Sequence, residues 1–379
     1  MKKILVFTGS RADYSLLRNL VKRISNKKTY KLDIAASSIH FMRDFGRTIK
    51  EVKKDKFNIR FQGKTKLKKN DFKSVINYCG NSMIEFSKFL QKSKPNIVIL
   101  LGDRYEVFSF CTSAFFLNIP IIHIHGGELT YGAFDDTLRH CITKMSNFHF
   151  VCHDIYKNRV KQLGENSNNI FNVGAPGLEN IQSKKFTKKK ILLEKLNIPE
   201  KKRIAVVTFH PETRTKTNPK KQIDTFLKAL FSVKDIFYIF TYSNTDPFGK
   251  YFIKKINKYK KYKNIRIFKT MGADLYHDVI KVSDLVIGNS SSGIFEAPSL
   301  KTPTLNIGRR QEGRIMGPSI FNCENRVMAI RQNILKILNK DNINFKNVFY
   351  KKDTSLKILN KINKILKLKR FSKKFYDIK

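Results

Sequence analysis

The chain has 379 residues, 41% of them hydrophobic, which is enough apolar material for two globular domains of ordinary size. It contains no run of eighteen uncharged apolar residues, and Met1-Lys2-Lys3 leads directly into a predicted strand, so we expect neither a membrane span nor a signal peptide. The five cysteines are scattered and show no CxxC spacing, so we expect buried, reduced thiols in a cytoplasmic protein and no metal site.

Positive charge is the most unusual property of the composition. Lysine and arginine total 75 against 30 acidic residues, which gives a formal net charge of +45. Such an excess can indicate a protein that binds nucleic acid or an anionic membrane surface. The lysines are spread over the whole chain, however, and no RNA-recognition, zinc-finger or helix-turn-helix signature occurs. We interpret the charge as a solvated surface that attracts an anionic small substrate, and we expect neither nucleic acid nor membrane as a partner.

The N-terminal segment predicts a strand followed by an anion-binding turn. Residues 3–8 form an apolar run, and residues 9–14 (Gly-Ser-Arg-Ala-Asp-Tyr) lead into a helix. A strand that ends in Gly-Ser before a helix N-terminus suits an anion, and Arg11 would be its charged partner. The turn lacks the GxGxxG spacing, so the sequence does not support a dinucleotide site, and we expect no cofactor.

Acidic side chains follow two predicted strands in the middle of the N-terminal half. Buried parallel strands are predicted at residues 97–101 and 119–124. Asp103 follows the first strand, Glu128 follows the second, and Asp135 begins the next helix. Because open α/β sheets place their ligands at the carboxyl ends of the strands, we predict a proton-transfer site here. Asp103 and Asp135 could instead only cap the helices that follow them.

The second half repeats the alternation of strands and helices after a Gly/Pro-rich hinge at residues 174–177. His210 follows a predicted strand at 203–209, where an imidazole would be exposed. Another predicted strand ends at the loop Gly-Asn-Ser-Ser-Ser-Gly, residues 288–293, whose N–H groups and hydroxyls could cradle a pyrophosphate while Glu296 accepts bonds from ribose. An ordinary serine N-cap, with Glu296 completing a capping box, explains this loop equally well.

This alternation predicts the α/β class, with two Rossmann-like domains that face a central cleft and with C-terminal helices. We place the boundary in the hinge. Residues 1–175 would form an N-terminal domain that carries the acid/base residues. Residues 176–379 would form a nucleotide-binding domain that includes the terminal helices.

Eight motifs occur in an order that resembles one known family. They are GSRADY (9–14), LLGDRYEVFS (100–109), HIHGGE (123–128), FDDTLRH (134–140), FNVGAPGLEN (171–180), FHPET (209–213), IGNSSSGIFEAPSL (287–300) and NIGRRQEGR (306–314). Over roughly residues 1–320 the chain resembles the hydrolysing UDP-N-acetylglucosamine 2-epimerases of bacterial sialic acid synthesis. The related non-hydrolysing enzymes would show TRPE near the start, EAGLR in place of HGGEL, and HRREN in place of FHPET.

The resemblance implies a glycosyltransferase-B-like fold and a reaction in two steps. UDP is eliminated across C1–C2 of the sugar, and the resulting 2-acetamidoglucal is hydrated to N-acetylmannosamine. Both steps need positioned acids and bases, because the hydrogen at C2 is only weakly acidic. The matching catalytic positions are Asp103, Glu128, Asp135 and His210. The matching substrate-binding positions are Arg11, His125, Asn289, Ser290, Ser291, Ser292, Gly293 and Glu296.

Other functions stay open at this point. Enzymes with similar motifs act on a UDP- or GDP-linked 2,4-diacetamido-2,4,6-trideoxyhexose of the legionaminic acid pathway, and the sequence does not reveal the pocket around C4 and C6 of the sugar. A glycosyltransferase of the same fold would require an acceptor sugar. A nucleic-acid-binding protein would bind arbitrary duplexes with an affinity that falls steeply with salt. For a hydrolysing epimerase, which is the favoured interpretation, we expect a nucleotide sugar and further copies of the chain in a homo-oligomer as partners.

Overall fold

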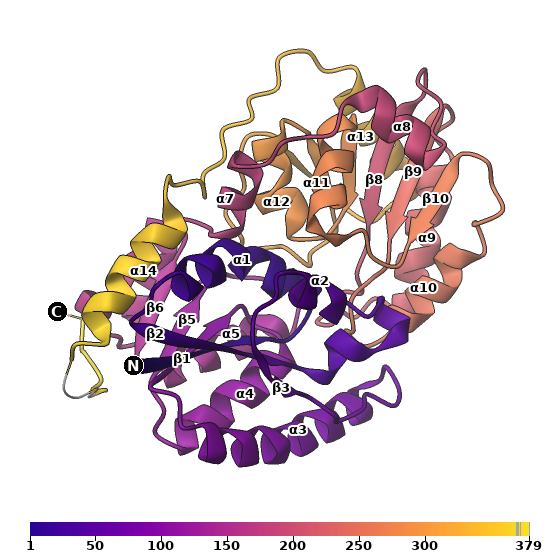
Figure 1. Ribbon diagram of the computed structural model, residues 1–379. Coiled ribbons are helices and arrows are strands. Elements are labelled where there is room, and N and C mark those ends of the chain that lie inside the picture. The colour runs from indigo at the N-terminus through magenta and orange to yellow at the C-terminus, as the bar shows by residue number, and fades with distance from the viewer. Residues whose placement is uncertain (369–370, 372, 379) are drawn as a thin grey trace. The chain divides into compact units, whose positions relative to one another are not determined.

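A computed structural model describes residues 1–368, 371 and 373–378, and for Arg11 it describes the backbone only (Figure 1). The chain groups into two compact units. Unit 1 comprises residues 1–128, 135–182 and 349–379, and unit 2 comprises residues 129–134 and 183–348. Each unit is built on its own parallel sheet, which confirms the predicted α/β class.

Seven parallel strands form the sheet of unit 1, in the order β3-β2-β1-β4-β5-β6-β7. They are β1 (Lys2–Thr8), β2 (Tyr30–Ala36), β3 (Ile59–Gln62), β4 (Ile97–Leu101), β5 (Ile121–Ile124), β6 (Phe148–Val151) and β7 (Ile170–Asn172). The strand order reverses between β1 and β4, which pair directly although β2 and β3 come between them in the chain. Open α/β sheets bind ligands at such a switch point, at the carboxyl ends of the strands.

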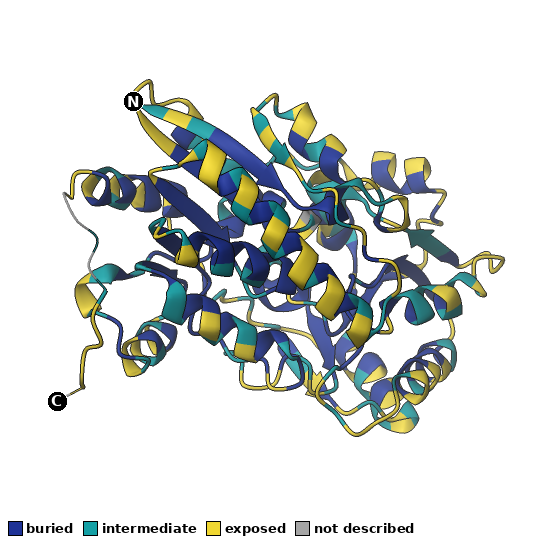
Figure 2. Ribbon diagram, turned by 90° about the horizontal axis from the view of Figure 1, so that it is seen from below, coloured by how far each residue is buried: buried dark blue, intermediate teal, exposed yellow. Residues whose placement is uncertain are grey.

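Alternate residues of β1 pack into two different cores, because successive side chains of a strand point to opposite faces of the sheet. Ile4 and Val6 belong to one buried cluster, and Leu5 and Phe7 belong to another. The helices of unit 1 are α1 (Arg11–Ser25), α2 (Ile49–Lys54), α3 (Phe72–Ser93), α4 (Tyr105–Phe116), α5 (Asp135–Met145), α6 (Asp154–Gln162), α7 (Gly177–Gln182) and α14 (Thr354–Ile365). Figure 2 shows helices that are buried on one side and exposed on the other, around buried strands.

The last helix, α14, belongs to unit 1, whereas the expected division placed residues 176–379 together. Its residues Ile358, Leu359 and Ile362 are buried in the same cluster as Ile4 of β1. Helix α7 is also part of unit 1, so the chain enters residues 183–348 of unit 2 seven residues after the hinge residue Pro176. The amphipathic pattern of α14 indicates that one face is buried, but it does not tell which of two cores covers that face.

Unit 2 has six parallel strands in the order β10-β9-β8-β11-β12-β13. They are β8 (Arg203–Thr208), β9 (Ile236–Thr241), β10 (Ile265–Phe268), β11 (Leu285–Gly288), β12 (Thr304–Ile307) and β13 (Ile320–Cys323). Its helices are α8 (Lys189–Leu196), α9 (Pro219–Phe231), α10 (Gly249–Asn257), α11 (Gly272–Val282), α12 (Ser292–Phe295) and α13 (Val327–Leu338). The switch point of this sheet lies between β8 and β11, so the FHPET and GNSSSG motifs leave neighbouring strands.

Short 3₁₀ helices complete the fold: η1 (Ser38–Phe41), η2 (Arg43–Phe45), η3 (Ser167–Asn169) and η4 (Ala297–Leu300). The strands β3 and β13 are among those that the sequence analysis does not predict. β3 is only half-buried, and both are short, so neither produces a strong apolar run. In the described part of the chain, no helix combines the length and apolar character needed to cross a membrane.

Candidate active site

The turn after β1 is held by a buried carboxyl group. Asp13, in the first turn of α1, accepts hydrogen bonds on Oδ2 from the backbone N–H groups of Gly9 (2.8 Å) and Ser10 (2.9 Å). Its Oδ1 accepts a bond from the Ser10 hydroxyl at 3.2 Å. These two N–H groups are therefore engaged within the protein, and an anion at this turn would need other donors. Arg11, the predicted donor, begins α1, but its side chain lies outside the described part of the structure.

A second carboxyl group, that of Glu106 in α4, lies close to Asp13. Glu106 is fully buried and forms an ion pair with Arg104, whose Nε lies 3.1 Å from Oε2. Burial raises the pKa of Asp13 to about 7, an effect that the Arg104 charge opposes and the Glu106 charge adds to. Sequence reasoning named none of these three residues, although all lie within the GSRADY and LLGDRYEVFS motifs.

Asp103 lies at the carboxyl end of β4, where it forms an ion pair with Arg139 of α5. Arg104, rather than Asp103, occupies the N-cap position of α4, which begins at Tyr105. Arg139 is almost fully buried and also pairs with Asp136, at 3.3 Å. Burial lowers the pKa of the guanidinium, but the neighbouring carboxylates, led by Asp103, outweigh it and raise the pKa.

Arg139 links this pair to the second predicted acid. Its Nη1 donates a hydrogen bond of 2.8 Å to the backbone carbonyl of Glu128. One guanidinium therefore fixes the position of Asp103 relative to the loop after β5. Sequence reasoning missed Arg139. The available signal was its helical spacing, three residues after Asp136 in the FDDTLRH motif.

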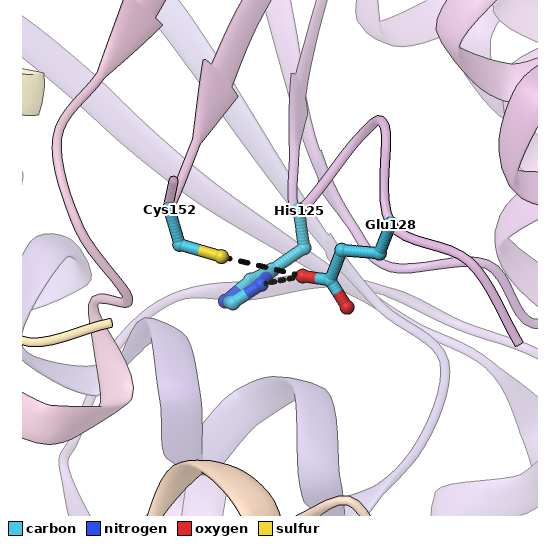
Figure 3. A group of neighbouring side chains, drawn as sticks. All are labelled: His125, Glu128 and Cys152. Atoms are coloured by element: carbon cyan, nitrogen blue, oxygen red, sulfur yellow. Dashed lines mark hydrogen bonds and ion pairs between the residues drawn. The ribbon is translucent and has the colours of Figure 1, made fainter. Parts of the chain in front are cut away.

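The HGGE loop after β5 brings His125 and Glu128 together with Cys152, which follows β6 (Figure 3). Nδ1 of His125 lies 2.5 Å from Oε1 of Glu128, and the Cys152 thiol donates to the same oxygen at 3.5 Å. All three residues are buried. The loop is tightly packed, because a Cβ on Gly127, whose φ is +77°, would lie 2.4 Å from a backbone oxygen of Tyr156. The predicted acid Glu128 thus has two side-chain donors on one oxygen.

Asp135 is the first residue of α5 and is buried. The predicted acidic set therefore occupies three strand or helix ends within unit 1: Asp103 after β4, Glu128 after β5, and Asp135 at the start of α5. His123, inside β5, is a hydrogen-bonded core residue, as its apolar surroundings in the sequence indicate. Its Nε2 lies 2.7 Å from the carbonyl of Gly102, which positions the turn that carries Asp103.

In unit 2, the predicted residue His210 follows β8 and is positioned by Asn289. The Asn289 amide exchanges two hydrogen bonds with the His210 backbone: Oδ1 accepts from N–H at 2.7 Å, and Nδ2 donates to the carbonyl at 2.9 Å. Nδ1 of His210 accepts from the backbone N–H of Asn244 at 3.2 Å. In the neutral ring the proton is therefore on Nε2, which makes that nitrogen a hydrogen-bond donor. Asn289, predicted as a substrate ligand, is fully buried and engaged in this structural role.

The serine loop after β11 begins a helix of only four residues, α12. Ser291 is exposed in the capping position and makes no side-chain cap bond. The hydroxyl of Ser292 lies 3.0 Å from that of Ser290 and 2.7 Å from the hydroxyl of Tyr276. Gly293 is required for packing, since a Cβ there would lie 2.7 Å from Cγ2 of Thr304. Two of the three hydroxyls thus already interact with each other.

Glu296 does not complete a capping box, because it follows the last residue of α12 rather than lying in its first turn. Its Oε1 lies 3.1 Å from Nε2 of His277 in α11. The alternative interpretation of the loop as a serine cap with a capping box is therefore wrong. His277, which sequence analysis did not single out, holds the carboxylate that we expect at the ribose.

Residues of the NIGRRQEGR motif donate hydrogen bonds to the backbone of the same loop. Arg310 and Gln311 both donate to the backbone carbonyl of Asn289, at 3.2 and 2.8 Å. Glu212, of the FHPET motif, accepts the backbone N–H of Arg309 at 2.7 Å. Three motifs that are far apart in the sequence therefore converge around Asn289. Sequence reasoning recognised the motifs but did not foresee these contacts.

In chemical terms the two units offer different groups. Unit 1 presents carboxyl groups in different surroundings, one paired with a guanidinium and another with an imidazole and a thiol, which suits proton transfer. Unit 2 presents a hydroxyl-rich loop and a histidine at the switch point of its sheet, which suits an anionic or sugar ligand. The part each predicted residue plays in binding or catalysis stays a prediction.

Comparison with known proteins identifies the family. A family model described as UDP-N-acetylglucosamine 2-epimerase matches residues 22–363. The chain is 39% identical over 328 residues to the GDP/UDP-N,N'-diacetylbacillosamine 2-epimerase (hydrolyzing) of Campylobacter jejuni, covering 85% of this chain and 84% of that protein. It is 36% identical to the polysialic acid biosynthesis protein P7 of Escherichia coli, over 100% and 98% of the two chains.

The same family appears among solved structures. The crystal structure of UDP-GlcNAc 2-epimerase from Neisseria meningitidis bound to UDP-GlcNAc matches with a TM-score of 0.77 at 17% identity, covering 96% of this chain and 100% of that one. At this identity the match shows the fold alone, which is the predicted glycosyltransferase-B-like arrangement of two parallel-sheet domains. Sequence and fold thus agree, and this chain belongs to the UDP-N-acetylglucosamine 2-epimerase family.

Proposed function

We propose that this protein is a hydrolysing UDP-N-acetylglucosamine 2-epimerase that releases UDP and N-acetylmannosamine for sialic acid synthesis. The observation that carries the proposal is a pair of contacts made by Arg139. Its guanidinium binds the carboxylate of Asp103 and the backbone carbonyl of Glu128. Two carboxyl groups in different environments therefore follow neighbouring strands, β4 and β5. An elimination followed by a hydration needs such a set of acids and bases.

The elimination removes the hydrogen at C2 while the C1–O bond to the diphosphate breaks. Asp103 faces a buried guanidinium, which stabilises the charged carboxylate that a base requires. Nδ1 of His125 lies 2.5 Å from Oε1 of Glu128, so in this mechanism the two residues would pass a proton between them. In this scheme Asp103 or Asp135 accepts the C2 proton, and the His125–Glu128 pair handles the proton that returns to C2 when water adds at C1.

Unit 2 would bind the leaving group. Ser291 is exposed at the start of α12, and Glu296 is held in place by His277. His210 would offer its Nε2–H to a phosphate or sugar oxygen, because Nδ1 is engaged by the backbone. Arg11 would add a positive charge. A solved relative is described as bound to UDP-GlcNAc, which supports a nucleotide sugar as the ligand of this fold.

A second substrate has a specific observation in its favour. The relative from Campylobacter jejuni, at 39% identity, is named for GDP/UDP-N,N'-diacetylbacillosamine, and one from Legionella pneumophila, at 31% identity, for the UDP form. The same chemistry on a UDP- or GDP-linked 2,4-diacetamido-2,4,6-trideoxyhexose is therefore the alternative function. The relative named for polysialic acid covers the whole chain at 36% identity, which supports the first choice.

Incubation with each nucleotide sugar, followed by NMR of the released free sugar, decides between these substrates. N-acetylmannosamine from UDP-N-acetylglucosamine supports the proposal, and release of a diacetamido sugar alone supports the alternative. In deuterated water the product should carry deuterium at C2, because that proton is exchanged through the glycal. Retention of the original hydrogen would rule out the elimination route. Turnover that requires an acceptor sugar would point to a glycosyltransferase.

A further inference from the structure

We propose that His125, Glu128 and Cys152 form a binding site for a thiophilic divalent cation of the zinc class, and that the bound cation inhibits the enzyme. One ligand atom from each of these residues lies within 4.8 Å of the other two, and all three residues are buried. Figure 3 shows the three side chains pointing toward one another. The inhibition rests on the proposed role of Glu128 in proton transfer, whereas the binding does not.

The ligand set selects the metal. Thiolate, imidazole and carboxylate together suit Zn²⁺, while Mg²⁺ and Ca²⁺ prefer oxygen ligands alone. Tetrahedral coordination at ordinary zinc bond lengths separates the ligand atoms by roughly 3.3–3.6 Å. The Cys152 sulfur already lies 3.5 Å from Oε1 of Glu128. The imidazole nitrogen, at 2.5 Å from the same oxygen, would have to move by roughly 1 Å.

Charge balance favours occupancy. A divalent cation with one carboxylate, one thiolate and a neutral imidazole has no net charge, which matters for a buried site. Two guanidinium groups contact the loop: Arg139 donates to the carbonyl of Glu128 and Arg159 to that of Gly127. The charge of Arg139 is compensated by its pairs with Asp103 and Asp136.

Binding displaces the thiol proton of Cys152, which passes to solvent. The hydrogen bond between His125 and Glu128 breaks, and the imidazole proton moves from Nδ1 to Nε2, so that Nδ1 can coordinate the cation. Affinity should therefore rise with pH.

The surrounding fold holds the ligands in place. His125 and Cys152 directly follow β5 and β6, which are paired strands, so their carboxyl ends are adjacent. The intervening loop is closely packed, since a Cβ on Gly126 would lie 2.9 Å from Oγ1 of Thr143. Because the backbone is held by these elements, coordination would require movement of the side chains only. With three protein ligands, the fourth position would be open to water or a substrate oxygen, as in zinc sites that are not purely structural.

Spacing rules did not reveal this site, because its ligands come from two different strand ends. The expectation of no metal site depended on the spacing of the cysteines alone, which shows no CxxC pair. Among the described residues, Cys152 is the one cysteine whose sulfur lies within 4.8 Å of ligand atoms of both a histidine and a glutamate. Cys141, on α5, is exposed and serves as a matched control.

The test uses Co²⁺ as a spectroscopic substitute for Zn²⁺ on the chelator-treated full chain. We expect one Co²⁺ per chain, with a thiolate-to-cobalt charge-transfer band in the wild type and in Cys141→Ser. The band should be lost in Cys152→Ala, with affinity at least about 10-fold weaker. If Cys152→Ala does not fold by circular dichroism, Cys152→Ser serves instead. A band that persists without the Cys152 sulfur, or no stoichiometric binding to the wild type, overturns the proposal.

Activity provides the second readout. Zn²⁺ should inhibit release of the free sugar, and a chelator should restore it. For whichever Cys152 variant retains turnover, inhibition should require at least about 10-fold more Zn²⁺ than for wild type or Cys141→Ser. Cobalt binding with the expected Cys152 dependence, but with no activity on any nucleotide sugar, would defeat the proposed function and leave the metal site intact. Stoichiometric binding without inhibition of an active enzyme overturns the inhibitory role.

Discussion

Arg139 reaches Asp103 from inside the protein: the arginine side chain is 1% exposed, while the aspartate side chain is 21% exposed. The buried arginine thus supplies a positive charge, and the more exposed aspartate carries the accessible carboxylate. Asp136, at 3.3 Å, shares the same guanidinium. A buried charge of this kind is stable only while its partners remain.

Replacing the guanidinium should therefore cost both stability and activity. In Arg139→Met, Asp103 and Asp136 lose their common partner and the carbonyl of Glu128 loses a donor. We expect a loss of about 3–5 kcal/mol in the free energy of unfolding, measured by urea titration. Arg139→Lys retains the charge but cannot make all three contacts. Its free energy of unfolding should therefore lie between those of the wild type and Arg139→Met.

An exposed arginine serves as the matched control. Arg309 pairs with Glu312 at the surface, where its side chain is 73% exposed. Arg309→Met should leave the unfolding transition nearly unchanged, because solvent screens exposed pairs. If Arg139→Met and Arg309→Met lower the free energy of unfolding equally, Arg139 and its partners do not form a buried charge network.

Catalytic and binding residues should separate in kinetics. Asp103→Asn and Glu128→Gln are nearly isosteric and remove proton-transfer capacity, so each should lower kcat by about 10²-fold or more, with little change in KM. Ser291→Ala and Arg11→Ala should instead raise KM, because they remove contacts present in both ground and transition states. Isothermal titration of UDP into all four variants checks this. If Asp103→Asn binds UDP as poorly as Ser291→Ala while folded, Asp103 is a binding or structural residue.

The sequence predicted the fold well wherever local chemistry was strong. Apolar runs between glycines and prolines marked β1, β4, β5, β8 and β11, the strands on which the candidate residues lie. The rule that ligands bind at the carboxyl ends of strands indicated Asp103, which the structure shows to follow β4 beside the switch point of unit 1. His210 follows β8, beside the switch point of unit 2. Strands such as β13 were missed because four residues with mixed burial carry little periodicity.

Contacts between distant segments could not be predicted in the same way. The pairing of Asp103 with Arg139 depends on how α5 packs against α4 and β5, which no spacing rule contains. Cys152 meets Glu128 only because β5 and β6 are adjacent in the sheet. Conversely, the four-residue spacing on α5 would favour a pair between Asp136 and His140, but Asp136 forms its ion pair with Arg139.

The placement of α14 gives a test of the unit boundaries. Ile362 is fully buried in the core of unit 1, so Ile362→Ala should cost about 2–5 kcal/mol. Because the chain has two units, hydrogen exchange is a sharper measurement than a single melting curve. Protection should fall in β1 and α1 and stay unchanged in β8 and β9. Loss of protection confined to unit 2 would restore the expected boundary near residue 176.

Stability should also depend on Asp13. Its pKa is raised from 3.8 to about 7 in the folded protein, chiefly by burial, so between these values the native state holds a proton that the unfolded state has released. Stability from this group is therefore greatest at the acidic end and is lost as pH rises toward 7, by at most about 1.4 kcal/mol per pH unit. The protonated form keeps its contacts: Oδ2 still accepts from Gly9 and Ser10, while the Oδ1 proton can be donated to the Ser10 hydroxyl.

Asp13→Asn should remove this dependence, because an amide can make the same contacts without titrating. Urea titrations of the wild type and the variant at several pH values from 4 to 8 measure it as a difference, so that other titrating groups cancel. We expect the variant to gain stability relative to the wild type as pH rises through this range, and to be the more stable protein at pH 8. A difference that does not change with pH would mean that Asp13 is ionised throughout, held by Arg104 and the two backbone N–H groups against the cost of burial.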